Sequence, residues 1–547
     1  MLPIANGRFS HTRRRLIGAL PIGLLLGSTA LRGVWAQDAE TPAEGVEPDL
    51  AATEAPADEG TEFSFDILTQ WMREKAATEY QAPDTALPEV IANLNYDDYR
   101  HIQFDADRAR WSEETSQFRV HAFHPGWLYN ELVDMFEVVD GRARSMAFSP
   151  ADFNYYGPLE DVFTDDTQLP GVVGFRLNNP LNRPDIFDEL IAFVGASYFR
   201  SMGRGNFYGL SARGLAINTG IGSSEEFPRF SQFYLERPAP GQRNAIVYAA
   251  LDSQSVTGAF RFDIAPGEET EIHVTARLFF RSTVEQLGVA PMTSMFLYAE
   301  NNRSRFDDYR PQVHDSNGLI IHRDGGDVLW RALTNPVRLG SSYFAETNPR
   351  GFGLYQRDRE FEAYQDAEAH YERRPSLLIE PDGDWGAGHV RLVEIPSDLE
   401  VNDNIVAFWI PAESVTAGEE REYRYFMRWG DLNPDAGSDL AHVLETRAGH
   451  GGVSGVENAP DLRKFVVDFK GGEVGRLPVG TEDIEPVVTV TGAEIVGMVL
   501  KKIDGDVWRL VLDVRVAGAT TVEFVAHLRG YGRRLSETWL YQWMIEA

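Results

Sequence analysis

The chain has 547 residues, a formal net charge of -32 and no cysteine. Its length and its 43% share of hydrophobic residues are enough for two or more packed globular domains. The negative charge disfavours nucleic acid and anionic lipid as partners, and the absence of cysteine excludes disulfides, thiolate metal sites and cysteine nucleophiles. A neutral or cationic ligand therefore suits this composition best.

The first 36 residues have the pattern of an export signal. The sequence TRRRLI (12–17) leads into an apolar run over 16–31, and small residues then flank a cleavage position after Ala36. We interpret 1–36 as a twin-arginine signal peptide, which predicts a periplasmic protein. The alternative is a membrane anchor, but the apolar run is shorter than the about 20 residues that a spanning helix needs.

An acidic, low-complexity segment follows the signal. Residues 37–62 contain nine acids and no Lys or Arg, with repeated Ala, Pro and Thr, so we expect a disordered linker there. Ordered structure should begin at Phe63. Ile67, Leu68, Trp71 and Met72 then follow at helical spacing and predict a short helix that ends before Pro83.

The rest of the chain has the pattern of β structure. Short runs rich in β-branched and aromatic residues are separated by Gly, Pro, Asn and Asp. The clearest predicted strands are 118–123, 247–251, 271–280, 295–298, 390–395, 464–469, 485–491, 508–516, 521–528 and 536–543. A cluster of turn residues at 429–437 divides them. We predict a large β-sandwich over 63–430 and a small immunoglobulin-like sandwich over 431–547.

Common catalytic motifs are missing, but carboxylates gather with aromatic residues. The sequence has no G-x-S-x-G nucleophile elbow, no H-E-x-x-H zinc motif and no nucleotide-binding glycine loop. Acids concentrate in the segments 310–319, 356–381, 383–386 and 398–409. Aromatic rings stack on pyranose faces, and a carboxylic acid paired with a carboxylate can cleave a glycosidic bond. This mixture favours oligosaccharide chemistry.

A structural reading of the same acids stays open at this point. Asp403 would cap the strand that follows it, and Asp315 would form an Asx-turn with the residues after it. The charged run after Arg357 would be the solvated face of a helix. Composition alone favours this reading.

Several long motifs resemble one known family. They are GASYFRSMGRGNFYGLSARGLAINTG (195–220), EEFPRFSQFYLERP (225–238), LDSQSVTGAFRF (251–262), LGVAPMTSMF (287–296), PQVHDSNGL (311–319), NPRGFGLYQRDREFEAYQD (348–366), YERRPSLLIEP (371–381), NDNIVAFW (402–409) and SETWLYQW (536–543). In this order they resemble the periplasmic glucan biosynthesis proteins G and D, and the twin-arginine signal favours the D branch. The resemblance covers nearly all of the chain after the acidic linker.

The resemblance implies a fold and an activity. The expected fold is mainly β, with a sandwich similar to galactose mutarotase joined to the immunoglobulin-like domain. The family is linked to glycoside hydrolase activity on β-1,2-glucan backbones, and some members are transglycosylases. Its base is the Asp of an H-D-S motif and its acid the Asp of a D-N-I-V motif, which fall on Asp315 and Asp403. No cofactor or metal is implied.

The two acids would need different surroundings. An acid that donates a proton at neutral pH needs a raised pKa, which burial beside Ile405, Phe408 and Trp409 would supply to Asp403. Asp315 should stay ionised in a more polar setting. Further candidates are Tyr371, which would position a proton relay, and four residues that either contact substrate or are structural: Glu400, Asp366, Arg374 and Trp409.

Two points qualify the assignment. The family often has Asp where this chain has Asn317, so one charge beside Asp315 is missing. A second function also uses the same cleft: a non-catalytic scaffold that binds nascent glucan and guides it to membrane-bound synthase or modifying enzymes. The presence of both Asp315 and Asp403 favours the enzyme.

Overall fold

The computed structural model describes residues 60–545, except 114, 165–166, 435–437, 453–454, 456–460 and 517. The predicted signal peptide and most of the predicted linker lie outside this range. Strand β1 (Thr61–Glu62) pairs with β5 (Arg142–Ser145), so ordered backbone begins before the predicted boundary at Phe63. Among the described residues, no helix is long and apolar enough to cross a membrane.

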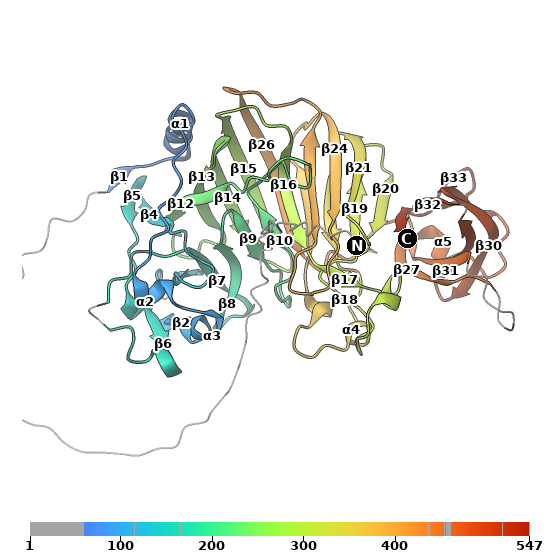
Figure 1. Ribbon diagram of the computed structural model, residues 1–547, viewed down its shortest axis with the longest axis horizontal. Helices are drawn as coiled ribbons and strands as arrows, with labels where there is room; N and C mark the ends of the chain where they lie inside the picture. The colour runs from blue at the N-terminus through green and yellow to red at the C-terminus, as the bar shows by residue number, and fades with distance from the viewer. Residues whose placement is uncertain are drawn as a thin grey trace, which may run out of the picture.

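Two large sheets form the central part of the molecule (Figure 1). The 16-stranded sheet has the order β1, β5, β4 (Asp134–Val139), β12 (Arg229–Glu236), β13 (Ala245–Asp252), β14 (Val256–Ala265), β15 (Thr270–Phe280), β26 (Glu420–Gly430), β23 (Ser376–Pro381), β22 (Gly351–Tyr355), β19 (Gly318–His322), β20 (Val328–Ala332), β34 (Thr538–Met544), β32 (Thr521–Gly530) and β29 (Ile484–Thr491), with β33 (Arg533–Arg534) beside β32. The 10-stranded sheet has the order β21 (Gly340–Thr347), β24 (Ala387–Glu394), β25 (Ile405–Pro411), β16 (Leu287–Ser294), β10 (Ser211–Arg213), β9 (Tyr198–Ser201), β8 (Ile186–Val194), β7 (Gly174–Arg183) and β3 (Arg119–Phe123), with β11 (Leu215–Ile217) beside β16.

The main hydrophobic core combines residues of both sheets. In β15, Ile272, Val274 and Leu278 are buried at alternating positions, as expected for a strand with one face in the core. Strand β16 is buried at every position, because neighbouring structure covers both of its faces. Each strand predicted from the sequence is present, with ends that differ by a few residues.

The C-terminal strands form a second, smaller sandwich at one end of the long axis (Figure 1). One of its sheets consists of β27 (His442–His450), β28 (Leu462–Lys470), β31 (Val507–Val516) and β30 (Ala493–Asp504). The other layer is β29, β32 and β34, which continue the 16-stranded sheet, because β34 pairs in parallel with β20. A second core joins Trp330 and Tyr355 to Phe465 and Trp539 across this joint. The predicted boundary near residue 430 stays a prediction, but the strands on either side share one sheet.

Helices are short, and the fold class is mainly β as predicted. The longest helix, α1 (Phe65–Ala76), begins where Ser64 accepts a hydrogen bond from the amide of Ile67, and it packs Leu68 and Met72 against the 16-stranded sheet. The other helices are α2 (Glu89–Ala92), α3 (Tyr96–Tyr99), α4 (Phe361–Tyr364) and α5 (Gly472–Gly475), with 3-10 turns η1 (Ala106–Arg108), η2 (Pro150–Asp152), η3 (Gly157–Leu159), η4 (Arg303–Arg305) and η5 (Tyr371–Arg373). The two-sandwich arrangement is compatible with the mutarotase-like and immunoglobulin-like folds expected.

Two small sheets complete the structure. They pair β17 (Phe296–Tyr298) with β18 (Val313–His314), and β2 (Ile102–Phe104) with β6 (Phe153–Tyr155). Figure 1 shows β17, β18 and α4 together at one end of the central sandwich. Since Asp315 directly follows β18, this end of the sandwich holds the predicted site.

Candidate active site

One strand ties together the two segments that carry Asp403 and Asp315. The side chain of Asn404 accepts a hydrogen bond from the amide of Phe296 at 2.8 Å and donates one to its carbonyl at 2.9 Å. Phe296 lies in β17 and pairs with His314 in β18, which directly precedes Asp315. The amide next to Asp403 therefore fixes the loop before β25 to the strand pair that presents Asp315.

Asp403 is a buried carboxyl group with incomplete partners. Its side chain is 4% exposed, its Oδ2 lies 3.7 Å from a guanidinium nitrogen of Arg200, and Oδ2 makes no hydrogen bond within the described part of the chain. Burial raises the pKa of Asp403 to about 6, and the nearby Asp315 also raises it, while Arg200, Arg213 and Arg374 lower it. Burial is the largest cause of this rise, which is the direction expected for a proton donor.

Asp315 has a strong cationic partner. Nη1 of Arg374 donates a hydrogen bond to the buried Asp315 carboxylate, and the Asp315 amide donates to the carbonyl of Met295 at 2.8 Å. The Arg374 guanidinium lies over the ring of Tyr371, 4.1 Å from its centre. Burial raises the pKa of Tyr371, so its hydroxyl keeps its proton. Three of the predicted site residues thus form one connected group.

Asp366 and Glu400 are joined to each other by an arginine that sequence reasoning did not single out. Arg310 donates to Asp366 at 2.9 Å and lies 2.8 Å from Glu400. Asp366 also accepts the amides of Glu368 and Ala369, so it holds its own loop in place. The Glu400 side chain is 45% exposed and keeps an open side. Of the two, Glu400 is the one placed to contact a ligand.

Trp409 does not belong to the site. Its side chain is 0% exposed and lies in the main core, with its ring centre 6.1 Å from that of Trp385. A covered ring cannot stack on a sugar, so of the two roles that the sequence left open for Trp409, the structure favours the core role over a subsite contact. The reason is the side-chain alternation of β25, which turns Ile405, Ala407 and Trp409 toward the same core.

The charged run after Arg357 does not form the solvated helix of the structural reading. Only Phe361–Tyr364 is α-helical, and Tyr364 is fully buried. Asn317 accepts the amide of Arg357 at 3.1 Å and donates to Asp358 at 3.2 Å. An Asp at position 317 would place a second carboxylate against the buried Asp358, which explains why an amide suits this chain.

A cavity adjoins the acid on the side of β9. It has a volume of about 460 Å³, and its lining includes Tyr129, Glu189, Tyr198, Arg200 and Tyr208. Arg200 therefore links the cavity to Asp403. Sequence reasoning missed Tyr198, Arg200 and Tyr208 as site residues, although all three lie inside the motif 195–220.

The arrangement is suited to proton transfer between two oxygens. One carboxyl group keeps its proton up to about pH 6, and one carboxylate is held in a charge-assisted hydrogen bond. Such a pair can give a proton to one oxygen and take a proton from another. Over the described ranges, no group of three His, Asp or Glu side chains could hold a metal ion.

Comparison with known proteins places the chain in a family. The family model described as "Periplasmic glucan biosynthesis protein, MdoG" matches residues 63–543. "Glucans biosynthesis protein G" of Cereibacter sphaeroides is 56% identical over 97% of both chains. "Probable glucans biosynthesis protein D" of Shewanella oneidensis is 41% identical over 90% of this chain and 91% of its own. "Glucans biosynthesis protein D 1" of Ralstonia nicotianae is 44% identical over 92% and 95%.

These relatives carry both names, so they do not single out the D branch that the signal pattern favoured. The solved structure of the Slr1438 protein from Synechocystis covers 64% of this chain at 9% identity and a TM-score of 0.13, which is too low to bear on the fold. The match over 63–543 includes both sandwiches and every residue of the site described above. The chain belongs to the periplasmic glucan biosynthesis protein family.

Proposed function

We propose that the protein is a glycoside hydrolase or transglycosylase that acts on the β-1,2-linked backbone of periplasmic glucan, with Asp403 as the acid and Asp315 as the base. The observation that carries this proposal is the contrast between two neighbouring carboxyl groups. Asp403 has a pKa raised to about 6, whereas Asp315 accepts a charge-assisted bond from Arg374. Pairs of acids with opposed surroundings are characteristic of acid and base roles.

The reaction follows from these roles. Asp403 gives its proton to the glycosidic oxygen while the bond from that oxygen to the anomeric carbon breaks. Asp315 takes a proton from the attacking water in hydrolysis, or from a sugar hydroxyl in transglycosylation. After the reaction Asp403 is a carboxylate and Asp315 is protonated. Asp315 then releases a proton to solvent and Asp403 takes one up from solvent, which restores the starting state.

Two neighbouring features support a sugar in this place. Tyr371 lies beneath Arg374 with a protonated hydroxyl, which can pass a proton between the attacking oxygen and Asp315. The cavity beside Arg200 has aromatic and polar walls, a combination that suits a pyranose ring. We assign this cavity to one sugar unit on the leaving-group side of Asp403.

The proposal is tested with Asp403→Asn and Asp315→Asn on linear β-1,2-glucan. Both variants keep side-chain shape, but each removes a proton carrier, so turnover should fall about 10²-fold or more while glucan binding remains. Product analysis, binding affinity and melting temperature should be measured on the same preparations. Normal turnover in folded Asp403→Asn would exclude its role as the acid.

The same experiment distinguishes the enzyme from a non-catalytic glucan-binding scaffold. A scaffold would bind glucan and release no new product in the wild type, and neither substitution would change its binding. Formation of shorter or cyclic chains by the wild type, lost in both variants, supports the enzyme. Glucan binding without any product would favour the scaffold.

Export through the twin-arginine pathway is part of the proposal. It rests on the sequence around Arg13 and Arg14, because this segment lies outside the described residues. Changing both to Lys should hold the precursor inside the cell. An unchanged periplasmic yield of the double variant would show that another route is used.

A further inference from the structure

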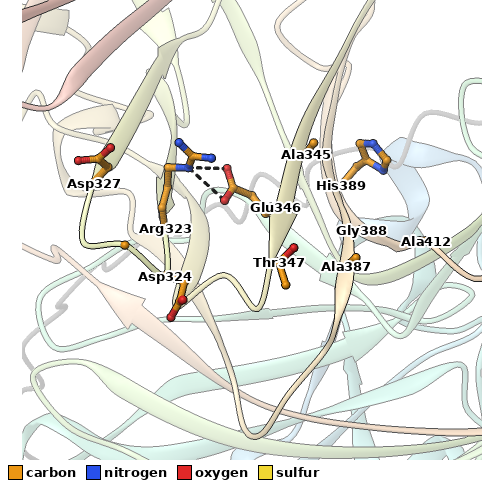
Figure 2. A pocket seen from close by; sticks show the side chains of 11 residues that line it. Arg323, Asp324, Asp327, Ala345, Glu346, Thr347, Ala387, Gly388, His389 and Ala412 are labelled. Carbon is orange, nitrogen blue, oxygen red and sulfur yellow. Dashed lines mark hydrogen bonds and ion pairs between the residues drawn. The ribbon is translucent and has the colours of Figure 1, made fainter.

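A second hollow lies at the opposite end of β19 from Asp315. It has a volume of about 600 Å³ and lies between the β19–β20 turn and the neighbouring ends of β21 and β24 (Figure 2). Asp315 precedes β19 and Arg323 follows it, so the length of this strand, about 16 Å for five residues, separates the two places. We call this hollow the distal groove, lined by Arg323, Asp324, Gly325, Asp327, Ala345, Glu346, Thr347, Ala387, Gly388, His389 and Ala412.

A buried acid fixes an arginine in the groove. The Glu346 side chain is 5% exposed, and Nε of Arg323 donates to its two oxygens at 2.9 and 3.1 Å (Figure 2). Nη1 and Nη2 of Arg323 make no hydrogen bond to any described residue, and the side chain is 41% exposed. The pair therefore fixes an arginine that lines the groove and leaves two of its nitrogen donors free.

The other wall combines small and polar side chains. Thr347 pairs with Ala387 and Ala345 pairs with His389 across β21 and β24, so these residues share the outer face of the sheet. The exposed ring of Tyr343, two residues before Ala345, lies edge-on to His389 at 6.1 Å. Alanines leave room for a ligand, and the tyrosine offers an apolar surface at the rim.

The charge of the groove disfavours an anion. Asp324, Asp327 and Glu346, against Arg323 and the Arg534 that lies 3.1 Å from Asp327, give a formal charge of -1 with His389 neutral, that is -3 and +2. No group of three acids and histidines in the described chain could hold a metal ion. The free guanidinium donors of Arg323 and the exposed carboxylate of Asp324 instead match the vicinal hydroxyls of a neutral polyol.

We propose that the distal groove is a second carbohydrate site, which holds a distant part of the same neutral glucan chain whose backbone is cleaved between Asp403 and Asp315. This inference rests on the proposed function, because that function supplies the glucan. A chain bound at both places gains affinity by its effective concentration, whereas a short oligosaccharide that reaches only one place does not.

The test compares long and short linear β-1,2-glucans in the Asp403→Asn background. Ala387→Arg fills the groove from an exposed position, and Arg323→Gln combined with Glu346→Gln removes the charges without leaving a lone buried carboxylate. Each should lower the ratio of long-chain to short-chain affinity by about tenfold in calorimetric titration. Ala77→Arg, at an exposed position after α1, is the matched control and should keep the ratio.

Each result has a definite meaning. An equal affinity ratio in both groove variants and in Ala77→Arg, with melting temperatures retained, would overturn the distal site and leave the cleavage proposal standing. If the cleavage proposal is wrong, Asp403→Asn and Asp315→Asn will leave product formation as in the wild type. A loss of long-chain affinity in both groove variants, but not in Ala77→Arg, supports the second site.

Discussion

Two buried carboxylates, Glu537 and Asp403, differ in how well the fold satisfies them. Glu537 lies at the joint between the sandwiches, where Arg357 donates to its two oxygens at 2.7 and 2.9 Å and the amide of Val443 donates at 2.8 Å. Asp403 has only a guanidinium at 3.7 Å and an oxygen without a hydrogen bond among the described residues. Burial of a charge alone therefore does not single out a candidate site, and it is incomplete pairing that distinguishes Asp403 from Glu537.

The two places also differ in what their arginines do. Arg357 lies over the ring of Trp330 at 3.5 Å, and both of its Nη atoms donate hydrogen bonds within the joint, to the carbonyl of Val443 and to Glu537. Arg200 faces both Asp403 and the cavity. An unsatisfied buried polar group costs about 1–3 kcal/mol of folding free energy. Interactions elsewhere in the fold, including those at the joint, must offset this cost at Asp403.

The largest effect is expected at the joint. Arg357→Ala leaves Glu537 buried without its cation, so the free energy of unfolding should fall by about 3–5 kcal/mol in denaturant titration. Arg183→Ala breaks the ion pair with Asp185, whose side chains are 64% and 62% exposed, and should cause no measurable change. Similar effects of the two substitutions would mean that the joint is no better paired than the surface.

Trp409 sharpens the boundary between core and site. Trp409→Ala should lower the free energy of unfolding by about 3–5 kcal/mol, because the ring fills the core and leaves room only for a glycine at 388, where a Cβ would lie 2.4 Å from it. Trp409→Phe keeps a core ring and should bind glucan as the wild type does. Weaker glucan binding by a fully stable Trp409→Phe would return this residue to the site.

The sequence predicted strands better than it predicted partners. Periodic or strongly apolar runs, such as 271–280, predict strands from local sequence alone, and the structure has strands at these positions. The role of Trp409 was left open between core and site because the run Ile405–Trp409 is apolar on both faces, so no alternation tells which face meets the core. In the structure every residue of that run is buried, so both faces of the strand are covered.

The sequence predicted the candidate site residues that lie within motifs, but not the contacts between residues that are far apart in the chain. Asp315, Asp403, Tyr371 and Arg374 were named from motifs, but the relation of Arg200 to Asp403 joins residues far apart in the chain. No local pattern reports such a contact. Arg310 was likewise missed, because its three acidic partners include Glu400, which follows at great sequence distance.

A smaller effect on the free energy of unfolding is expected when the incompletely paired Asp403 is replaced. Its pKa is raised from 3.8 to about 6, so wild-type stability is full below pH 4 and falls as the pH rises through about 6. A pKa difference of about two corresponds to about 3 kcal/mol of folding free energy. Asp403→Asn should therefore be more stable than the wild type by about this amount at pH 7. Thermal unfolding at pH 4 and pH 7 measures it.

The difference between variant and wild type should vanish near pH 4, where both side chains are neutral. Glu537→Gln is the matched control from the fully paired carboxylate, and it should lower stability at pH 7. A destabilised Asp403→Asn at pH 7 would show that the fold satisfies this carboxylate as well as it satisfies Glu537.

The smallest effect concerns Arg200, the cation nearest to Asp403. Its charge lowers the pKa of Asp403, so Arg200→Met should raise that pKa further and keep the acid protonated to higher pH. The falling alkaline limb of the kcat profile should then move upward by about one pH unit. Arg200→Lys keeps the positive charge and should leave the limb near its original place. A limb that does not move in Arg200→Met, with folding and glucan binding retained, would show that Arg200 only lines the cavity, and that burial together with Asp315, Arg213 and Arg374 sets the pKa of Asp403.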